Sequence, residues 1–127
     1  MRLTLMKSKL HRATVTEADL HYEGSISLDP ELIAHAKFNH YERVDIYNVN
    51  NGERFSTSVI PGKKGQIGLN GAAARRVMVG DRVIIVAYAD FEIVEAKAHK
   101  PTVVLLGENN SVTAVYEDSG RPLSEVI

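Results

Sequence analysis

Gly24 and Ser25 form a pair whose residue types allow a reaction within the backbone itself. If the Gly24 carbonyl is strained and polarised, the Ser25 hydroxyl can attack it and move the acyl group from nitrogen to oxygen. The resulting ester is a better leaving group than an amide, so elimination and hydrolysis would leave a pyruvoyl group at position 25. A glycine before a serine is more often a simple turn, because glycine adopts conformations closed to other residues. The dipeptide alone is therefore weak evidence for chemistry.

A second group of residues could bind an anion. Arg54 can form a bidentate pair with a carboxylate, which a lysine cannot imitate. Thr57 and Asn70 offer uncharged donors suited to an oxyanion. Gly71 and the alanines after it could present backbone N–H groups at the start of a helix. Taken singly, each feature is more typical of a hairpin strand followed by a capped short helix than of a site.

Basic and imidazole side chains also occur near the N-terminus. Lys9 and His11 are two positions apart, so in a strand they project from the same face. Such a pair is more often a solvated strand edge than a site. The chain has no cysteine, and its histidines show no metal-ligand spacing, so we predict no metal. They are His11, His21, His35, His40 and His99.

The composition is that of one ordinary globular domain. A chain of 127 residues buries roughly two-thirds of its unfolded surface. Its 44% hydrophobic and 24% charged residues are typical of a soluble protein, and a net charge of −1 with 6% aromatic residues argues against nucleic-acid binding. No apolar run reaches the roughly 18 residues of a membrane span. Without an apolar signal segment, we expect a cytoplasmic protein that does not enter membranes.

Alternating polar and apolar runs predict a mostly β fold in a single domain, 1–127. Asn51-Gly52 lies between two such runs and predicts a hairpin. Asp29-Pro30 predicts the start of a helix that ends near residue 38. The motifs ERVDI (42–46) and DRVII (81–85) resemble each other and suggest a barrel of two related halves. The tail from about residue 117 has turn composition, and we expect it to be poorly ordered. Strands are predicted at 3–8, 25–28, 43–49, 54–60, 66–69, 82–88, 102–106 and 112–116, and further short helices at 72–76 and 91–98.

Four motifs, taken together and in this order, are more specific than any one alone. They are HRATVT (11–16), DLHYEGS (19–25), NGERF (51–55) and NGAAA (70–74). In these motifs, and over roughly residues 1–106, the chain resembles bacterial aspartate 1-decarboxylase. The resemblance implies a double-psi β-barrel, a homotetramer with active sites between neighbouring subunits, and a pyruvoyl cofactor made by self-cleavage. It also implies decarboxylation of L-aspartate to β-alanine and CO2 for pantothenate and coenzyme A synthesis.

The resemblance further implies a role for each matching residue. Cleavage after Gly24 would give a β chain, 1–24, and an α chain, 25–127, whose pyruvoyl group from Ser25 forms a Schiff base with the substrate. Residues implied in self-cleavage are Gly24, Ser25, Thr57 and Asn70. Residues implied in substrate binding are Lys9, Arg54, Thr57, Gly71, Ala72 and Ala73. Residues implied in shaping the site are His11, Tyr22 and Tyr47.

Position 58 departs from the family's pattern. The family usually has a tyrosine there, whose phenol is taken as the proton donor after decarboxylation, and this chain has Ser58. A serine is shorter and a much weaker acid. Three explanations stay open: water relays the proton through Ser58, another group such as Tyr22 supplies it, or turnover is impaired. A milder departure is Tyr47, where some relatives carry a tryptophan.

Two alternatives to an active enzyme follow from these residues. The first is a precursor that processes itself slowly or not at all, and that stays inactive because Ser58 replaces the tyrosine. The second is a non-catalytic β-barrel in which Arg54 and Lys9 bind a small anion. An accessory protein that assists maturation is a further open expectation.

Overall fold

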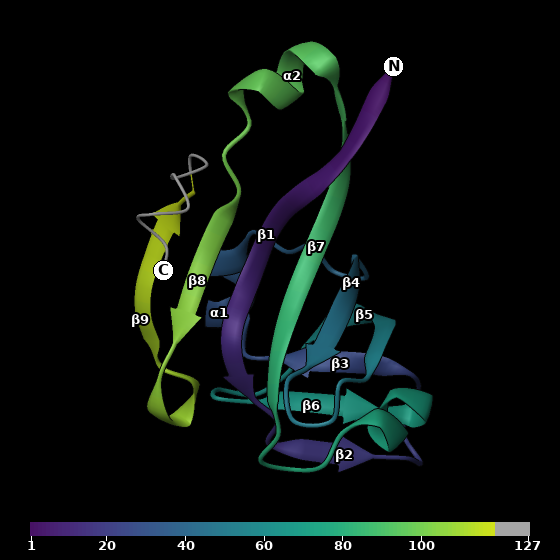
Figure 1. The fold of residues 1–127 in the computed structure, drawn as a ribbon. Coiled ribbons are helices and arrows are strands. Elements are labelled where there is room, and N and C mark those ends of the chain that lie inside the picture. The colour runs from purple at the N-terminus through teal and green to yellow at the C-terminus, as the bar shows by residue number, and fades with distance from the viewer. Residues whose placement is uncertain (119–127) are drawn as a thin grey trace.

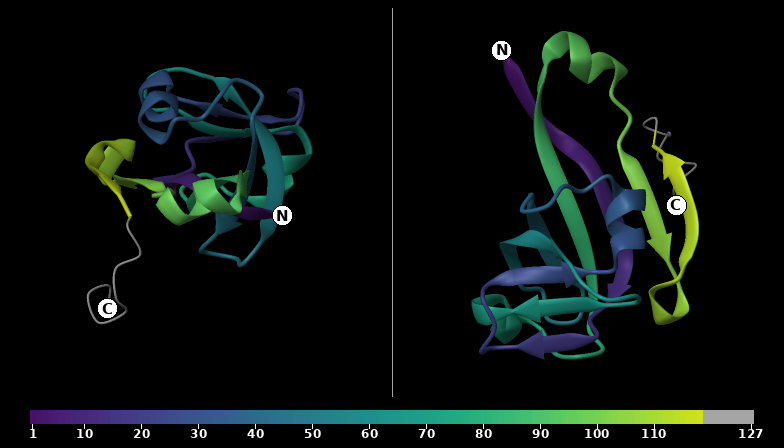
Figure 2. Two further views of the ribbon diagram at one scale, coloured as in Figure 1. Left: turned by 90° about the horizontal axis from the view of Figure 1, so that it is seen from above. Right: turned by 180° about the vertical axis from the view of Figure 1, so that it is seen from behind.

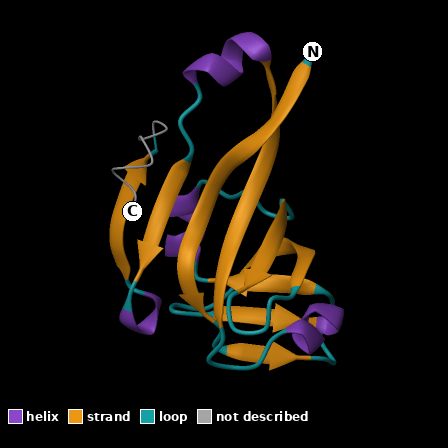
Figure 3. Cartoon of the chain, viewed as in Figure 1, coloured by secondary structure: helices purple, strands orange, loops and turns teal. Residues whose placement is uncertain are grey.

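Strands dominate the computed structural model, which describes residues 1–118 (Figure 1, Figure 3). The strands are β1 (Arg2–Thr14), β2 (Glu17–Asp19), β3 (Ser25–Leu28), β4 (Arg43–Asn48), β5 (Arg54–Pro61), β6 (Ile67–Asn70), β7 (Arg82–Glu92), β8 (Thr102–Leu106) and β9 (Val112–Glu117). The helical segments within these residues are α1 (Pro30–Ala36), α2 (Ile93–Ala98) and the 3-10 turns η1 (Gly71–Arg76) and η2 (Glu108–Asn110). The predicted mostly β class with few short helices is confirmed. The expected disorder of the tail concerns mainly residues 119–127, which lie outside the described residues.

The described strands form one nine-stranded mixed sheet in the order β2-β6-β3-β5-β4-β7-β1-β8-β9. The pairs β1–β8, β2–β6 and β3–β5 are parallel, and the other neighbours are antiparallel. The long strands β1 and β7 lie side by side in all views (Figure 1, Figure 2). The short strands β2, β3 and β6 run across one end of this pair, and α2 lies at the other end (Figure 1). Closure into a double-psi barrel stays a prediction.

The two similar motifs lie in neighbouring strands. ERVDI (42–46) enters β4 and DRVII (81–85) enters β7, and these strands pair antiparallel with Ile46 opposite Ile85. Because equivalent residues face each other, the local arrangement is that of a two-fold axis between the strands. Both isoleucines are fully buried, so the repeated motif supplies the centre of the core. Other fully buried core residues include Leu10, Ile26, Leu28, Leu32, Ile67, Leu69 and Val83.

Strand positions were predicted better than strand lengths. β3 and β8 have the predicted bounds, whereas β1 and β7 extend well beyond residues 3–8 and 82–88. The extra length comes from continuous pairing of β1 with β7 past two register shifts, near Met6 and near Arg12. At the second shift Arg12 has a φ of 65°, a left-handed conformation that breaks the alternation. β2 was not predicted, because all its residues are exposed and carry no apolar signal.

The predicted helix start at Asp29-Pro30 is confirmed. The Asp29 side chain accepts a hydrogen bond from the Glu31 backbone N–H at 2.8 Å, and Pro30 occupies the first turn. The helix ends at Ala36, two residues before the expected end, because Lys37 adopts a left-handed conformation. The Asn51-Gly52 segment does connect paired strands, but of the two only Gly52 has a positive φ. The connection is thus the longer loop 49–53 rather than a two-residue turn.

Candidate active site

Ser25 and Asn70 lie directly opposite each other, because β3 and β6 pair antiparallel in that register. The Asn70 side-chain amide donates hydrogen bonds to Ser25 Oγ at 3.0 Å and to Ser27 Oγ at 2.9 Å. Ser25 Oγ in turn donates to the Glu23 carbonyl oxygen at 3.3 Å. Ser25 and Asn70 are only 4% and 6% exposed. A buried hydroxyl is therefore held by a neutral donor beside the peptide segment that precedes it.

Gly71 holds the backbone before Ser25 in place by close approach. Its φ is +66°, and a Cβ atom at this position would lie 2.8 Å from Gly24 Cα and 3.1 Å from the Tyr22 carbonyl oxygen. Any side chain at residue 71 would collide with this backbone. At Gly24 itself an added Cβ would meet nothing within 4 Å. The two glycines thus have different roles. The missing side chain of Gly71 permits close contact with the backbone of residues 22–24, whereas Gly24 borders open space.

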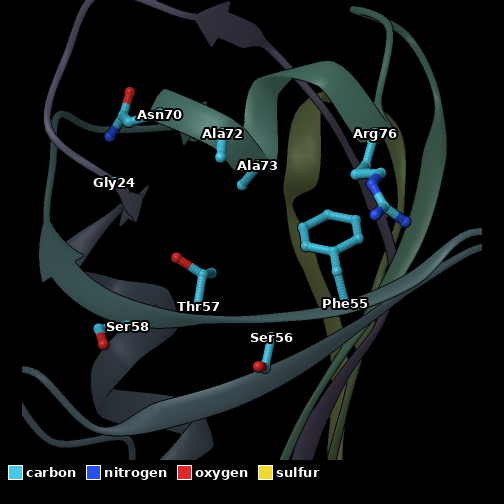
Figure 4. A pocket seen from close by; sticks show the side chains of 9 residues that line it. All are labelled: Gly24, Phe55, Ser56, Thr57, Ser58, Asn70, Ala72, Ala73 and Arg76. Atoms are coloured by element: carbon cyan, nitrogen blue, oxygen red, sulfur yellow. The ribbon is translucent and has the colours of Figure 1, made fainter.

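A pocket of about 320 Å³ opens at Gly24. Its lining residues are Gly24, Phe55, Ser56, Thr57, Ser58, Asn70, Ala72, Ala73 and Arg76. Thr57 projects from β5 into the pocket (Figure 4). Ser56 and Ser58 leave the strand on its other side in the same view, as alternation along a strand requires (Figure 4). Ser58 therefore contributes to the wall of this pocket without directing its hydroxyl into it.

The short helix η1 forms the opposite wall. Asn70 occupies its N-cap position but makes no side-chain cap, because its amide is committed to the two serines of β3. Ala72 and Ala73 follow and border the pocket (Figure 4). Their small side chains leave the backbone of the first turn close to the cavity. The predicted helix after Asn70 is confirmed in position, with 3-10 geometry.

Arg54 and Lys9 do not reach this pocket. Directly paired residues share a sheet face, and so do residues two apart on one strand. Val86 of β7 lies opposite Lys9 on one side and opposite Asp45 on the other, and Asp45 lies opposite Ser56. These four residues therefore lie on one face of the sheet. By the same rule this face, here called the outer face, carries Tyr47, Arg54 and Ser58, whereas Thr57 lies on the opposite face.

A separate hollow of about 220 Å³ lies on the outer face. Its lining includes Arg43, Asp45, Tyr47 and Arg54. The Arg54 guanidinium lies over the Tyr47 ring at 4.1 Å from its centroid, and no ion pair of Arg54 occurs within residues 1–118. An exposed guanidinium without a carboxylate partner is well suited to an incoming anion.

The remaining predicted residues border neither cavity. Tyr22 is 54% exposed and lines another hollow, whose lining also includes Ser27 and Asn70. His11 lies in β1 opposite Leu105 of β8. Burial, and then the charges of Lys9 and Arg12, lower the pKa of His11 below its ordinary 6.5. Its Nδ1 atom is buried and has no hydrogen-bond partner among the described residues.

Three residues that line the pocket were not predicted as site residues: Arg76, Phe55 and Ser56. Arg76 was predicted only as the end of a short helix, but it borders the pocket and forms an ion pair with Glu53 at 2.6 Å. Arg76 lies at the end of η1, three residues after Ala73, and this spacing could have predicted that both residues border the pocket. Phe55 borders the pocket and packs against the core; it shares a strand face with Thr57, from which its placement follows. Within residues 1–118, no group of three or more His, Cys, Asp or Glu residues could hold a metal.

Fold and pocket together define a class of protein: a small, mostly β protein in which a buried serine lies beside its own preceding backbone, next to a pocket of about 320 Å³. A sequence model of the family described as aspartate decarboxylase matches residues 1–113. A protein of Maricaulis maris named aspartate 1-decarboxylase is 59% identical over 116 residues, which cover 90% of this chain and 96% of the relative. Relatives of the same name from Bdellovibrio bacteriovorus and Ralstonia pickettii are 58% and 54% identical over 89% and 92% of this chain, and over 91% and 99% of their own lengths. The chain belongs to the aspartate decarboxylase family.

None of the helices in the described part of the chain has the length and apolar character needed to cross a bilayer.

Proposed function

We propose that this protein decarboxylates L-aspartate to β-alanine and CO2, after cleaving its own chain between Gly24 and Ser25. The observation that carries the proposal is the buried Ser25 hydroxyl, held by the Asn70 amide next to the pocket that Gly24 lines. Membership of the aspartate decarboxylase family supports the substrate. β-Alanine made in this way would serve pantothenate and coenzyme A synthesis in the cytoplasm.

The surroundings of Ser25 fit a pyruvoyl group formed from this side chain. The serine is held by neutral groups, the Asn70 amide and the Glu23 carbonyl. Gly24 borders the cavity without a side chain, and Ser25 follows it directly in the chain. Once formed, the group supplies an electron-withdrawing carbonyl that assists loss of an α-carboxylate, a task that other enzymes give to a bound cofactor.

Self-cleavage needs only the chain and one water molecule. Ser25 Oγ attacks the Gly24 carbonyl carbon, the C–N bond breaks, and the acyl group passes to oxygen. Loss of the Ser25 α-proton then breaks the Cβ–O bond, which frees the Gly24 carboxylate. Water replaces the remaining nitrogen, which leaves as ammonia. Thr57 points into the same pocket (Figure 4) and would supply an uncharged donor for the oxyanion of the first step. Asn70 holds the attacking Ser25 hydroxyl, and it could support the oxyanion once that hydrogen bond is released.

Substrate binding would combine two surfaces that one chain does not bring together. Gly24, Thr57, Ala72 and Ala73 border the pocket, whereas Lys9 and Arg54 lie on the outer face. A neighbouring copy that presents its outer face to the pocket would complete the site, as the proposed homotetramer requires. Arg54 would then bind a substrate carboxylate bidentately, with Lys9 as a second cation.

Mixed assemblies test this division of the site. Ser25→Ala and Arg54→Ala chains should each be inactive alone. When they are co-expressed, about one quarter of the sites in a random assembly would combine an intact Ser25 with an intact Arg54 of the neighbouring copy. Recovered CO2 release is the expected result. No recovery in a confirmed mixed assembly would place both residues in the same chain's site.

Denaturing mass spectrometry tests the proposed function itself. We expect two pieces, residues 1–24 and 25–127, with no free amino group on the larger piece. Ser25→Ala should give one intact chain and no CO2. A cleaved and fully active Ser25→Ala protein would overturn the mechanism.

Two further outcomes identify the alternatives. An uncut chain that becomes cut when a cell extract is added indicates an accessory maturation protein. An uncut chain that binds aspartate and releases no CO2 is the non-catalytic anion-binding protein or the inactive precursor.

A further inference from the structure

The outer face carries two phenols in contact. The hydroxyl oxygens of Tyr47 on β4 and Tyr88 on β7 lie 2.8 Å apart, and the Arg54 guanidinium covers the Tyr47 ring at 4.1 Å. Tyr88 is 41% exposed, so the pair borders solvent on the face that also bears Ser58. Arg43, Asp45 and Lys9 are the other charged groups of this region of the face.

The two phenols share one hydrogen bond. The bond to Tyr47, and next burial, raise the pKa of Tyr88 to about 12. Either phenol can donate this hydrogen bond; when Tyr88 donates, the proton of Tyr47 is free to point away from the pair. Once Tyr47 has given up its proton, its oxygen can accept a hydrogen bond from Tyr88, and its ring lies beneath the Arg54 guanidinium.

Decarboxylation requires such a donor. The Cα–carboxylate bond breaks, CO2 leaves without the bonding electrons, and a proton must join the electron pair left on carbon. Ser58 is a poor source, because an aliphatic hydroxyl is a far weaker acid than a phenol, whose pKa is about 10. Within residues 1–118 the other tyrosines lie elsewhere: Tyr22 and Tyr41 in loops and Tyr116 on β9.

We propose that Tyr47, positioned by Tyr88 and Arg54, is the acid that protonates the substrate carbon after CO2 leaves. This rests on the proposed function, and it places Tyr47 beside the carboxylate-binding Arg54 in the site completed by a neighbouring copy. The O–H bond of Tyr47 breaks as the new C–H bond forms. A water molecule then returns a proton to the phenolate, so one proton is taken from solvent for each CO2 released. Tyr88 is a positioning residue that holds the phenolate.

Tyr47→Phe removes the proton and keeps the ring beneath Arg54. We expect complete self-cleavage and unchanged trapping of aspartate by borohydride, with kcat lowered roughly 100-fold or more and KM little changed. Tyr88→Phe should lower kcat by a smaller factor. Tyr41→Phe is the matched control, because this phenol is exposed in the turn before β4, and it should behave as wild type.

The stereochemistry of the product gives a readout that a structural role would not move. In D2O the wild-type protein should place one deuterium on a single face of the amine-bearing carbon of β-alanine. Tyr47→Phe should give both faces, because solvent then delivers the deuteron without a positioned donor. Tyr88→Phe should retain one face.

Absorbance titration supplies a test that needs no turnover. The chain has no tryptophan, so phenolate absorbance is free of indole signals. Tyr47→Phe should bring the pKa of Tyr88 down from about 12 toward the ordinary value of 10.

Four results would overturn the proposal. All four concern the Tyr47→Phe protein. They are a kcat within twofold of the wild-type value, deuterium still placed on one face of the product, failure of the chain to self-cleave, and an unchanged pKa of Tyr88 in the absorbance titration. If instead wild-type protein stays uncut or releases no CO2, the proposed function itself is wrong.

Discussion

Replacing Gly71 by alanine would place a methyl group against the backbone of the bond that we expect to break. The new Cβ would lie 2.8 Å from Gly24 Cα and 3.0 Å from Gly24 N. Both distances are shorter than ordinary van der Waals contact, and the atoms met are backbone rather than a flexible side chain. Either the 22–24 segment or the start of η1 must move.

The size of the effect follows from two contributions. A left-handed conformation costs a residue with a Cβ roughly 1–2 kcal/mol, and overpacking a tight contact typically costs about 1–3 kcal/mol. Gly71→Ala should therefore lower the free energy of unfolding by about 2–5 kcal/mol. Gly52→Ala is the matched control: its φ is +77° and its Cβ would meet nothing within 4 Å, so only the conformational cost of about 1–2 kcal/mol applies.

Denaturant unfolding of the two variants in an uncleavable Ser25→Ala background measures this difference. The rate of self-cleavage, followed by mass spectrometry in chains that keep Ser25, measures displacement of Gly24. A displacement near 1 Å can slow an intramolecular reaction by about 100-fold, so Gly71→Ala should cleave far more slowly than Gly52→Ala. Equal unfolding free energies and equal cleavage rates for Gly71→Ala and Gly52→Ala would show that the contact between residue 71 and Gly24 affects neither stability nor self-cleavage.

Three further predictions concern single side chains. Asn70→Ala should abolish self-cleavage and lower the free energy of unfolding by about 1–3 kcal/mol, because two buried serine hydroxyls, Ser25 and Ser27, lose their donor; a wild-type cleavage rate would contradict this. Arg54→Lys should raise KM for aspartate about tenfold without changing cleavage, since lysine lacks the bidentate fork; an unchanged KM in steady-state assays would remove Arg54 from binding. Burial, then nearby cations, lower the pKa of His11, so the unfolded chain binds its proton more readily than the folded chain. Stability should therefore fall as pH drops through 6.5, and His11→Asn should flatten this dependence in urea titrations at several pH values.

Local patterns predicted most of the strands, because alternation and turn residues act over a few positions. β3 and β8 were placed with their observed bounds, and the cap at Asp29 followed from one residue type. The lengths of β1 and β7 could not be predicted in this way. They depend on pairing between strands some 80 residues apart, which continues past the shift at Arg12 where local alternation fails.

The site was predicted as a set of residues but not as an arrangement. The contact of Ser25 with Asn70 depends on the register of β3 against β6, and no local pattern fixes a register between distant strands. For the same reason the sequence did not predict that Thr57 and Arg54 belong to different sites. They are three residues apart on one strand, so their side chains lie on opposite faces of the sheet. The phenol pair of Tyr47 and Tyr88 likewise requires β4 and β7 to be neighbours.

The place of Ser25 at the first residue of β3 determines what happens to the two pieces once the chain is cut. Residues 2–14 stay paired with β7 on one side and with β8 on the other. The new end at residue 25 belongs to a strand that lies between β5 and β6. Severing the link leaves these ladders intact, so the 24-residue fragment should remain attached through a chromatography column and separate only when the protein is denatured.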